Sequence, residues 1–130
     1  MIKVNTAPHY SKLPNKISIS NISNYGNTKI LKLYSLLGSY CKNVEDENRL
    51  TRLFEILVPY CPVNVSWEER KRRFLQGVTS LNLAEELTFL ANLIGVEEIT
   101  LCCREPRDDE HCRRKLIYDV LPNEIKGVRE

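Results

Sequence analysis

The densest group of basic residues is the run 70–73, Arg-Lys-Arg-Arg. Adjacent cations can neutralise the phosphates of a nucleic acid, and such a run also occurs in nuclear import signals. Glutamates 68 and 69 precede the last two arginines of the run by four residues, the favourable order for ion pairs along a helix. Three interpretations therefore stay open: a solvated helix face, a phosphate-binding face and an import signal.

Three thiols and one imidazole lie close together near the C-terminus: Cys102, Cys103, His111 and Cys112. These are ligand types that zinc prefers. The spacing is unusual for zinc, because it contains no pair of cysteines separated by two residues and because adjacent ligands point in diverging directions. We therefore expect no metal and no cofactor, with these four residues as weak candidates for zinc. Buried thiols with a surface histidine are the main interpretation, and a redox-active Cys102-Cys103 pair is another.

The chain has five cysteines, an odd number without the regular spacing of a secreted disulfide framework. Reduced thiols are therefore expected. Cys41 and Cys61 each follow a tyrosine in an apolar context, which indicates small core residues.

Groups for catalysis are few. The two histidines are His9 and His111, and the acidic residues 108–110 before His111 suit an ordinary helix start as well as a metal site. Glu124-Ile125-Lys126 has the residue types of a metal-dependent nuclease core, but it falls in the segment that we expect to be a polar C-terminal tail. Gly-rich phosphate loops and nucleophile elbows are missing from the sequence. We expect no enzymatic activity and no catalytic residue.

The formal net charge of +2 conceals an uneven distribution. Residues 1–44 contain six lysines and no acidic residue, a charge of +6, so residues 45–130 carry −4. A basic end of this kind suits a polyanion, an anionic membrane surface or an acidic protein. The residues we expect to bind such a partner are Lys3, Lys12, Lys16, Lys29, Lys32, Arg70, Lys71 and Arg73.

Hydrophobic periodicity predicts helices over about 28–41, 46–58, 67–77 and 83–94, and a further one between Asp108 and Pro122. Ser66 with Glu69, and Asn82 with Glu85, have the spacing of capping boxes. Gly95 is expected to end the fourth helix. Residues 96–103 fit both helical spacing and strand alternation, and we favour a helix.

Residues 1–27 are rich in Asn, Ser and Pro, which is typical of a polar arm, and the alternation at 17–20 is too short to define a sheet. We expect a basic arm over 1–27, a helical domain over 28–122 and a polar, fraying tail over 123–130. The predicted fold class is therefore all-α: a single-domain bundle of five to six short helices with an extended, basic N-terminal arm.

Glu69 to Phe74, together with Leu57-Val58-Pro59 before it and Glu97 to Leu101 after it, resembles pieces of the helical N-terminal domain of influenza matrix proteins. The resemblance covers a small part of the chain, and the intervening lengths differ. It implies binding to membranes and ribonucleoprotein through basic helical surfaces.

No segment has the apolar length of a membrane span or of a signal peptide, so we expect an intracellular protein, cytoplasmic or nuclear. The function we expect is a non-enzymatic protein-protein interaction module, such as a regulator, an adaptor or a small viral accessory or structural protein. It would act through helix faces and the N-terminal arm, on another protein or on a second copy of itself. The alternative is a matrix-like protein that binds nucleic acid or an anionic membrane surface.

Overall fold

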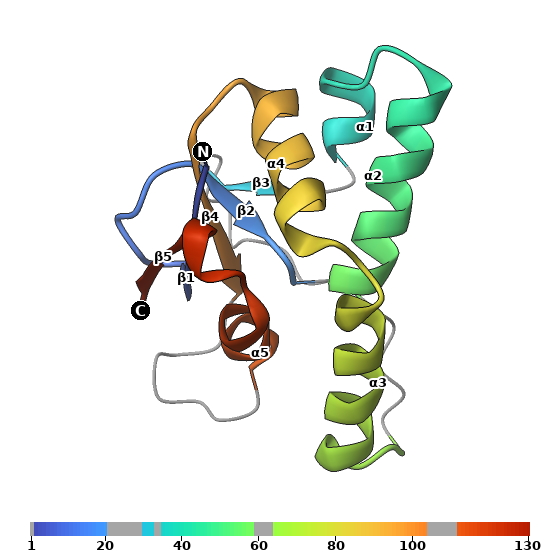
Figure 1. Ribbon diagram of the computed structural model, residues 1–130, viewed down its shortest axis with the longest axis vertical. Coiled ribbons are helices and arrows are strands. Elements are labelled where there is room, and N and C mark those ends of the chain that lie inside the picture. Colours follow the sequence, from blue (N-terminus) through green and yellow to red (C-terminus); the bar gives the residue numbers. More distant parts are fainter. Residues whose placement is uncertain (1, 21–29, 33–34, 59–63, 104–111) are drawn as a thin grey trace.

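A parallel β-sheet of five strands forms the centre of the protein (Figure 1). The computed structural model describes residues 2–20, 30–32, 35–58, 64–103 and 112–130. Within them the strand order is β3-β2-β4-β1-β5. The strands are β1 (Lys3–Pro8), β2 (Lys16–Ser18), β3 (Leu31–Lys32), β4 (Glu98–Cys103) and β5 (Lys126–Arg129).

Helices fill the long connection between β3 and β4 and the connection between β4 and β5. The α-helices are α1 (Ser35–Ser39), α2 (Val44–Leu57), α3 (Trp67–Thr79), α4 (Leu83–Ile94) and α5 (Arg113–Val120), and a short 3-10 turn, η1 (Asn123–Ile125), precedes β5. In Figure 1, α2, α3 and α4 lie on one side of the sheet, and the blue loop between β1 and β2 lies on the other.

The strand register divides the sheet into an apolar and a polar face. In parallel strands, paired residues point to the same side, and neighbours along a strand point to opposite sides. Val4 pairs with Ile99, and Ile17 pairs with Leu101, so these four side chains share the apolar face. All four are completely buried. They belong to one core cluster with the apolar residues of α2, α3, α4 and α5.

The opposite face carries polar side chains: Asn5, Lys16, Ser18, Thr100 and Cys102. Residues 9–15, the β1–β2 loop, cover this face. The Thr100 hydroxyl donates a hydrogen bond to the Pro14 carbonyl at 2.7 Å, and the side-chain amide of Asn15 donates one to the Glu98 backbone carbonyl at 2.8 Å. Asn15 has a left-handed backbone (φ 54°), a conformation that Asn tolerates better than most residues.

The predicted helix caps are confirmed. The Ser66 hydroxyl accepts a hydrogen bond from the Glu69 amide, and the Asn82 side chain accepts one from the Glu85 amide. Gly95 ends α4 in a left-handed conformation, with φ at 75°. These local signals place the starts of α3 and α4 and the end of α4 where the sequence predicts them.

The expected all-α bundle is wrong, because the protein is an α/β fold around a parallel sheet. Residues 96–103, expected to be helical, contain β4, which is buried on both faces and therefore lacks a clean alternation of apolar and polar residues. The helical architecture suggested by the resemblance to matrix proteins does not apply either.

The expected N-terminal arm is also wrong for the described residues, since residues 3–8 and 16–18 are strands inside the sheet. Asn5 made this segment look solvated. Its side chain is completely buried. Burial of this amide is tolerated because it donates hydrogen bonds to the Glu98 carboxylate at 2.7 Å and to the Thr100 hydroxyl at 3.2 Å. The expected fraying tail contains η1 and β5, and β5 pairs with β1.

Close packing of β1 against β5 requires a glycine at position 127. A Cβ atom there would overlap Asn5 Oδ1 and would lie 2.8 Å from Lys3 Cγ and 3.0 Å from the Val4 carbonyl oxygen. We predict that Gly127→Ala lowers the free energy of unfolding by about 1–3 kcal/mol in urea titrations. Gly38→Ala is the control, because a Cβ at Gly38 meets nothing within 4 Å. Equal stability of the two variants would contradict this packing.

Candidate functional site

The carboxyl ends of β1, β2 and β4 lie side by side, and in open parallel sheets this edge is the usual location of a site. His9 Nε2 and Ser18 Oγ share a hydrogen bond of 3.1 Å across the end of β4. His9 is 8% exposed and Ser18 is 2% exposed. The Ser18 oxygen also accepts a hydrogen bond from the Ser20 amide. Burial of both side chains gives this pair a structural use: it joins the end of β1 to the end of β2.

Lys16 fastens the β1–β2 loop to the sheet. Its Nζ atom donates hydrogen bonds to the carbonyl oxygens of His9, at 2.8 Å, and of Ser11, at 2.7 Å. Hydrogen bonds from a charged donor are stronger than neutral ones. Lys16, expected to bind a polyanion, therefore uses two of its three N–H donors in hydrogen bonds within the protein.

The thiols of the neighbouring residues Cys102 and Cys103 point to opposite faces of β4. On the polar face, the Cys102 thiol donates to the Ile17 carbonyl at 3.5 Å, and burial raises the pKa of this thiol to about 12. On the apolar face, Cys103 Sγ lies 2.8 Å from Cys112 Sγ, and Arg114 contacts both sulfurs. The two adjacent cysteines therefore have different environments.

The structure separates the expected basic binding residues. Lys3 and Lys16 lie on the polar face of the sheet, Lys12 lies in the β1–β2 loop and Lys32 in edge strand β3, whereas the run 70–73 is on α3. Lys29 lies outside the described residues. The described members of the set are therefore divided between the sheet with its β1–β2 loop and α3.

Within the run 70–73, two arginines are occupied by ion pairs. The Glu69 carboxylate binds Arg72 at 2.5 Å and Arg73 at 2.9 Å. Hydrogen bonds from Arg72 and Arg73 lower the pKa of Glu69 to about 2. Arg70 and Lys71 are half-buried. This pairing, expected from the four-residue spacing for Arg73, reduces the positive charge that α3 offers to solvent.

Among the described residues, no three or more His, Cys, Asp or Glu side chains are arranged to hold a metal ion. Of the weak zinc candidates, His111 lies outside the described ranges, and Cys102 points away from Cys103 and Cys112. In the part of the chain that the structure describes, no helix combines the length and the apolar character that crossing a bilayer requires.

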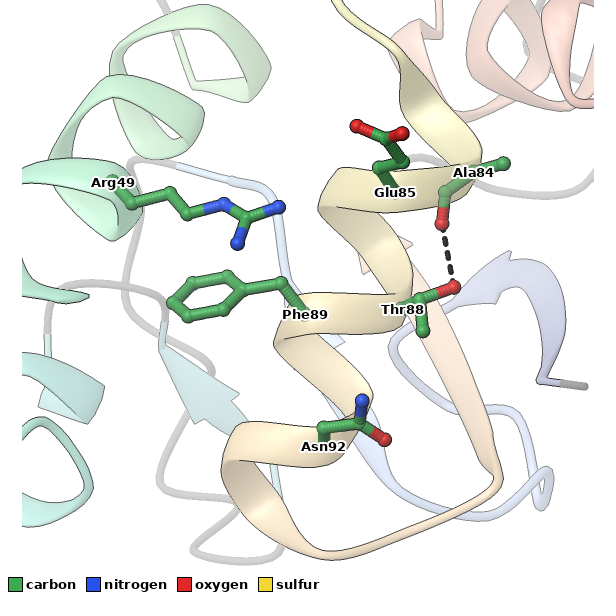
Figure 2. Close-up of a pocket in the computed structure, with 6 residues that line it drawn as sticks. All are labelled: Arg49, Ala84, Glu85, Thr88, Phe89 and Asn92. Atoms are coloured by element: carbon green, nitrogen blue, oxygen red, sulfur yellow. Dashed lines mark hydrogen bonds between the residues drawn. The ribbon is translucent and has the colours of Figure 1, made fainter.

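A hollow of about 470 Å³ lies over the outer face of α4 (Figure 2). Five residues of α4 and one residue of α2 line it: Ala84, Glu85, Thr88, Phe89, Asn92 and Arg49. Ala84, Thr88 and Asn92 recur every four residues and form one stripe along the helix. This site has no signal in the sequence, because Arg49 and Phe89 are distant in sequence and both fit ordinary amphipathic helices.

Arg49 and Phe89 form a fixed platform beside the hollow. The Arg49 guanidinium lies over the Phe89 ring, 4.3 Å from its centroid. It also donates two hydrogen bonds to the Glu86 carboxylate, at 3.0 and 3.2 Å. The Arg49 side chain remains 39% exposed. Its position is therefore set by two interactions while one side stays open to solvent.

Comparison with known proteins finds no matching family model, no matching curated protein and no matching solved structure.

We predict that Lys16→Met lowers the free energy of unfolding by about 1.5–3 kcal/mol, because two hydrogen bonds from a charged donor are lost. Urea titration measures this change. Lys12→Met is the matched control, since Lys12 is exposed and lies in the loop that Lys16 fastens. A Lys16→Met protein as stable as the control would show that the loop is not held by this side chain.

We predict that Cys102 resists alkylation in the native protein. With its pKa at about 12, the thiolate fraction at pH 8 is on the order of one in ten thousand. Iodoacetamide labelling followed by peptide mass spectrometry should find Cys102 unmodified in buffer and modified in urea. Equal labelling in both conditions would contradict the burial of this thiol.

Proposed function

We propose that this protein is a protein-protein interaction module that binds a helical segment of a partner protein along the outer face of α4. The observation that carries the proposal is the Arg49–Phe89 platform beside the hollow. Arginine and aromatic side chains are enriched among the residues that contribute most to protein interfaces.

Pre-ordering of Arg49 supports the proposal energetically. A long side chain that becomes fixed on binding loses rotamer freedom, at a cost of about 0.5–1.5 kcal/mol. Glu86 and Phe89 already hold Arg49 before any partner arrives. Much of that entropy cost is therefore absent at this position.

The dimensions and charges of the surface suit a helical partner. Ala84 to Asn92 span about 12 Å of α4, or about two helical turns. Small side chains at Ala84 and Thr88 let a second helix approach closely. The matching segment would place an apolar side chain over this stripe, an acidic residue near Arg49 and a basic residue near Glu85.

The surface on α4 replaces the N-terminal segment as the proposed interaction surface. Residues 3–8 and 16–18 belong to the sheet, and Ile17 and Ile19 are completely buried inside the protein. The N-terminal segment is therefore part of the sheet rather than a separate binding arm.

A selection of displayed helical peptides of random sequence tests the proposal. Peptides enriched on the wild-type protein should bind Thr88→Arg at least about tenfold more weakly, or about 1.4 kcal/mol, because a long cation then occupies the hollow. They should also shift the backbone amide NMR signals of α4.

Thr51→Arg is the matched control, since it makes the same change at an exposed position of α2 that does not line the hollow. Urea titration confirms that both variants fold. Peptides that bind Thr88→Arg and Thr51→Arg equally well, or whose signal shifts lie away from α4, would refute the proposal, as would a selection without any enriched peptide.

A further inference from the structure

A buried cluster of two thiols and one guanidinium joins the end of β4 to the start of α5. Cys103 ends β4 and Cys112 immediately precedes α5; they are 2% and 0% exposed. Their sulfur atoms lie 2.8 Å apart. Arg114, completely buried, has its Nη1 atom 2.8 Å from Cys103 Sγ and 3.0 Å from Cys112 Sγ.

We propose that Cys103 and Cys112 are a peroxide-sensitive dithiol that closes to an intramolecular disulfide. The proposal is independent of the peptide-binding surface on α4. It assigns a modification site to the carboxyl edge of the sheet, with hydrogen peroxide as the oxidant.

The distance favours bond formation. A disulfide has an S–S length of about 2.05 Å, so the two sulfur atoms need to approach by only about 0.8 Å. Small changes in side-chain torsion can supply such a shift. The positive charge of Arg114 against both sulfurs favours a thiolate at either one, and the thiolate is the reactive form of cysteine.

The chemistry proceeds in two steps that transfer two electrons to the peroxide. One thiolate attacks a peroxide oxygen and breaks the O–O bond, which gives a sulfenic acid and a hydroxide. The second sulfur attacks the sulfenic sulfur, forms the S–S bond and expels a second hydroxide. Both hydroxides take up the protons that the two thiols released, so the products are one disulfide and two water molecules.

Two other thiols of the chain provide a contrast within the same molecule. Cys102, next to Cys103, faces the opposite side of β4, and burial raises its pKa to about 12. Cys41 is half-exposed, but desolvation and the nearby Asp46 and Glu47 raise the pKa of its thiol. Neither has the arginine contact that Cys103 and Cys112 share.

The test treats the folded protein with hydrogen peroxide and maps its disulfides by mass spectrometry without reduction. Trypsin cleaves after Arg104 and Arg113, which places Cys103 and Cys112 on different peptides. The expected product is a cross-link between these peptides. Cys102→Ser, the matched control, should form the cross-link at the wild-type rate, whereas Cys103→Ser and Cys112→Ser should not form it.

The rate identifies the role of Arg114. Arg114→Lys keeps a positive charge but has a single charged nitrogen, and Arg114→Gln removes the charge. We expect cross-linking in Arg114→Gln to slow by on the order of tenfold, with an intermediate rate in Arg114→Lys. Circular dichroism of each variant selects those that fold.

The proposal is overturned if folded wild-type protein gives no Cys103–Cys112 cross-link. It is also overturned if cross-links involving Cys41, Cys61 or Cys102 form as readily as the expected one. Loss of the cross-link in Cys102→Ser would also contradict the proposal, because the disulfide would then involve Cys102 instead of Cys103.

Discussion

The insertion of β4 between β1 and β2 is the constraint on which the rest of the structure depends. Lys3–Pro8 and Lys16–Ser18 are neighbours in sequence, yet they do not pair with each other, and each pairs with β4 instead. The sheet therefore forms only when residues 98–103 arrive from the far end of the chain. Closing such a long loop costs entropy before the pairing repays it.

Two different faces of the sheet follow from this arrangement. The apolar face provides the surface on which α2, α3, α4 and α5 build one core. The polar face is closed by the β1–β2 loop, which Lys16 and Thr100 hold with hydrogen bonds. The same division separates the cysteines at the end of β4: Cys102 belongs to the polar face, and Cys103 meets Cys112 and Arg114 on the apolar face.

Helix-capping signals between close neighbours in sequence predicted the bounds of α3 and α4, whereas the helix expected over 28–41 is wrong in part, because residues 31–32 form strand β3. The capping signals at Ser66 and Asn82 and the stop at Gly95 depend only on nearby residues. Helices α3 and α4, which these residues delimit, lie where expected. The sheet depends on contacts between distant residues. Asn5 looks like a loop residue until Glu98 and Thr100 provide its hydrogen bonds, and β4 shows no alternation because both of its faces are buried.

The candidate sites also depend on contacts between residues that are distant in sequence. The sequence marks the cysteines as chemically important, but the alternation of side chains along β4 places Cys102 and Cys103 on opposite faces of the sheet. The basic residues cluster by position in the sequence, whereas the fold distributes the described ones over the sheet, its β1–β2 loop and α3. The Arg49–Phe89 platform requires α2 and α4 to lie side by side, and this placement has no signal in either helix alone.

Amide hydrogen exchange tests most directly whether the N-terminal segment belongs to the central sheet. We predict that amides bonded within β1 and β4, such as those of residues 4–7 and 99–102, exchange as slowly as the most protected amides of α2 and α4, through global unfolding. Exchange of residues 3–8 at the rate of an unstructured chain, while α2 and α4 stay protected, would contradict the placement of this segment in the sheet.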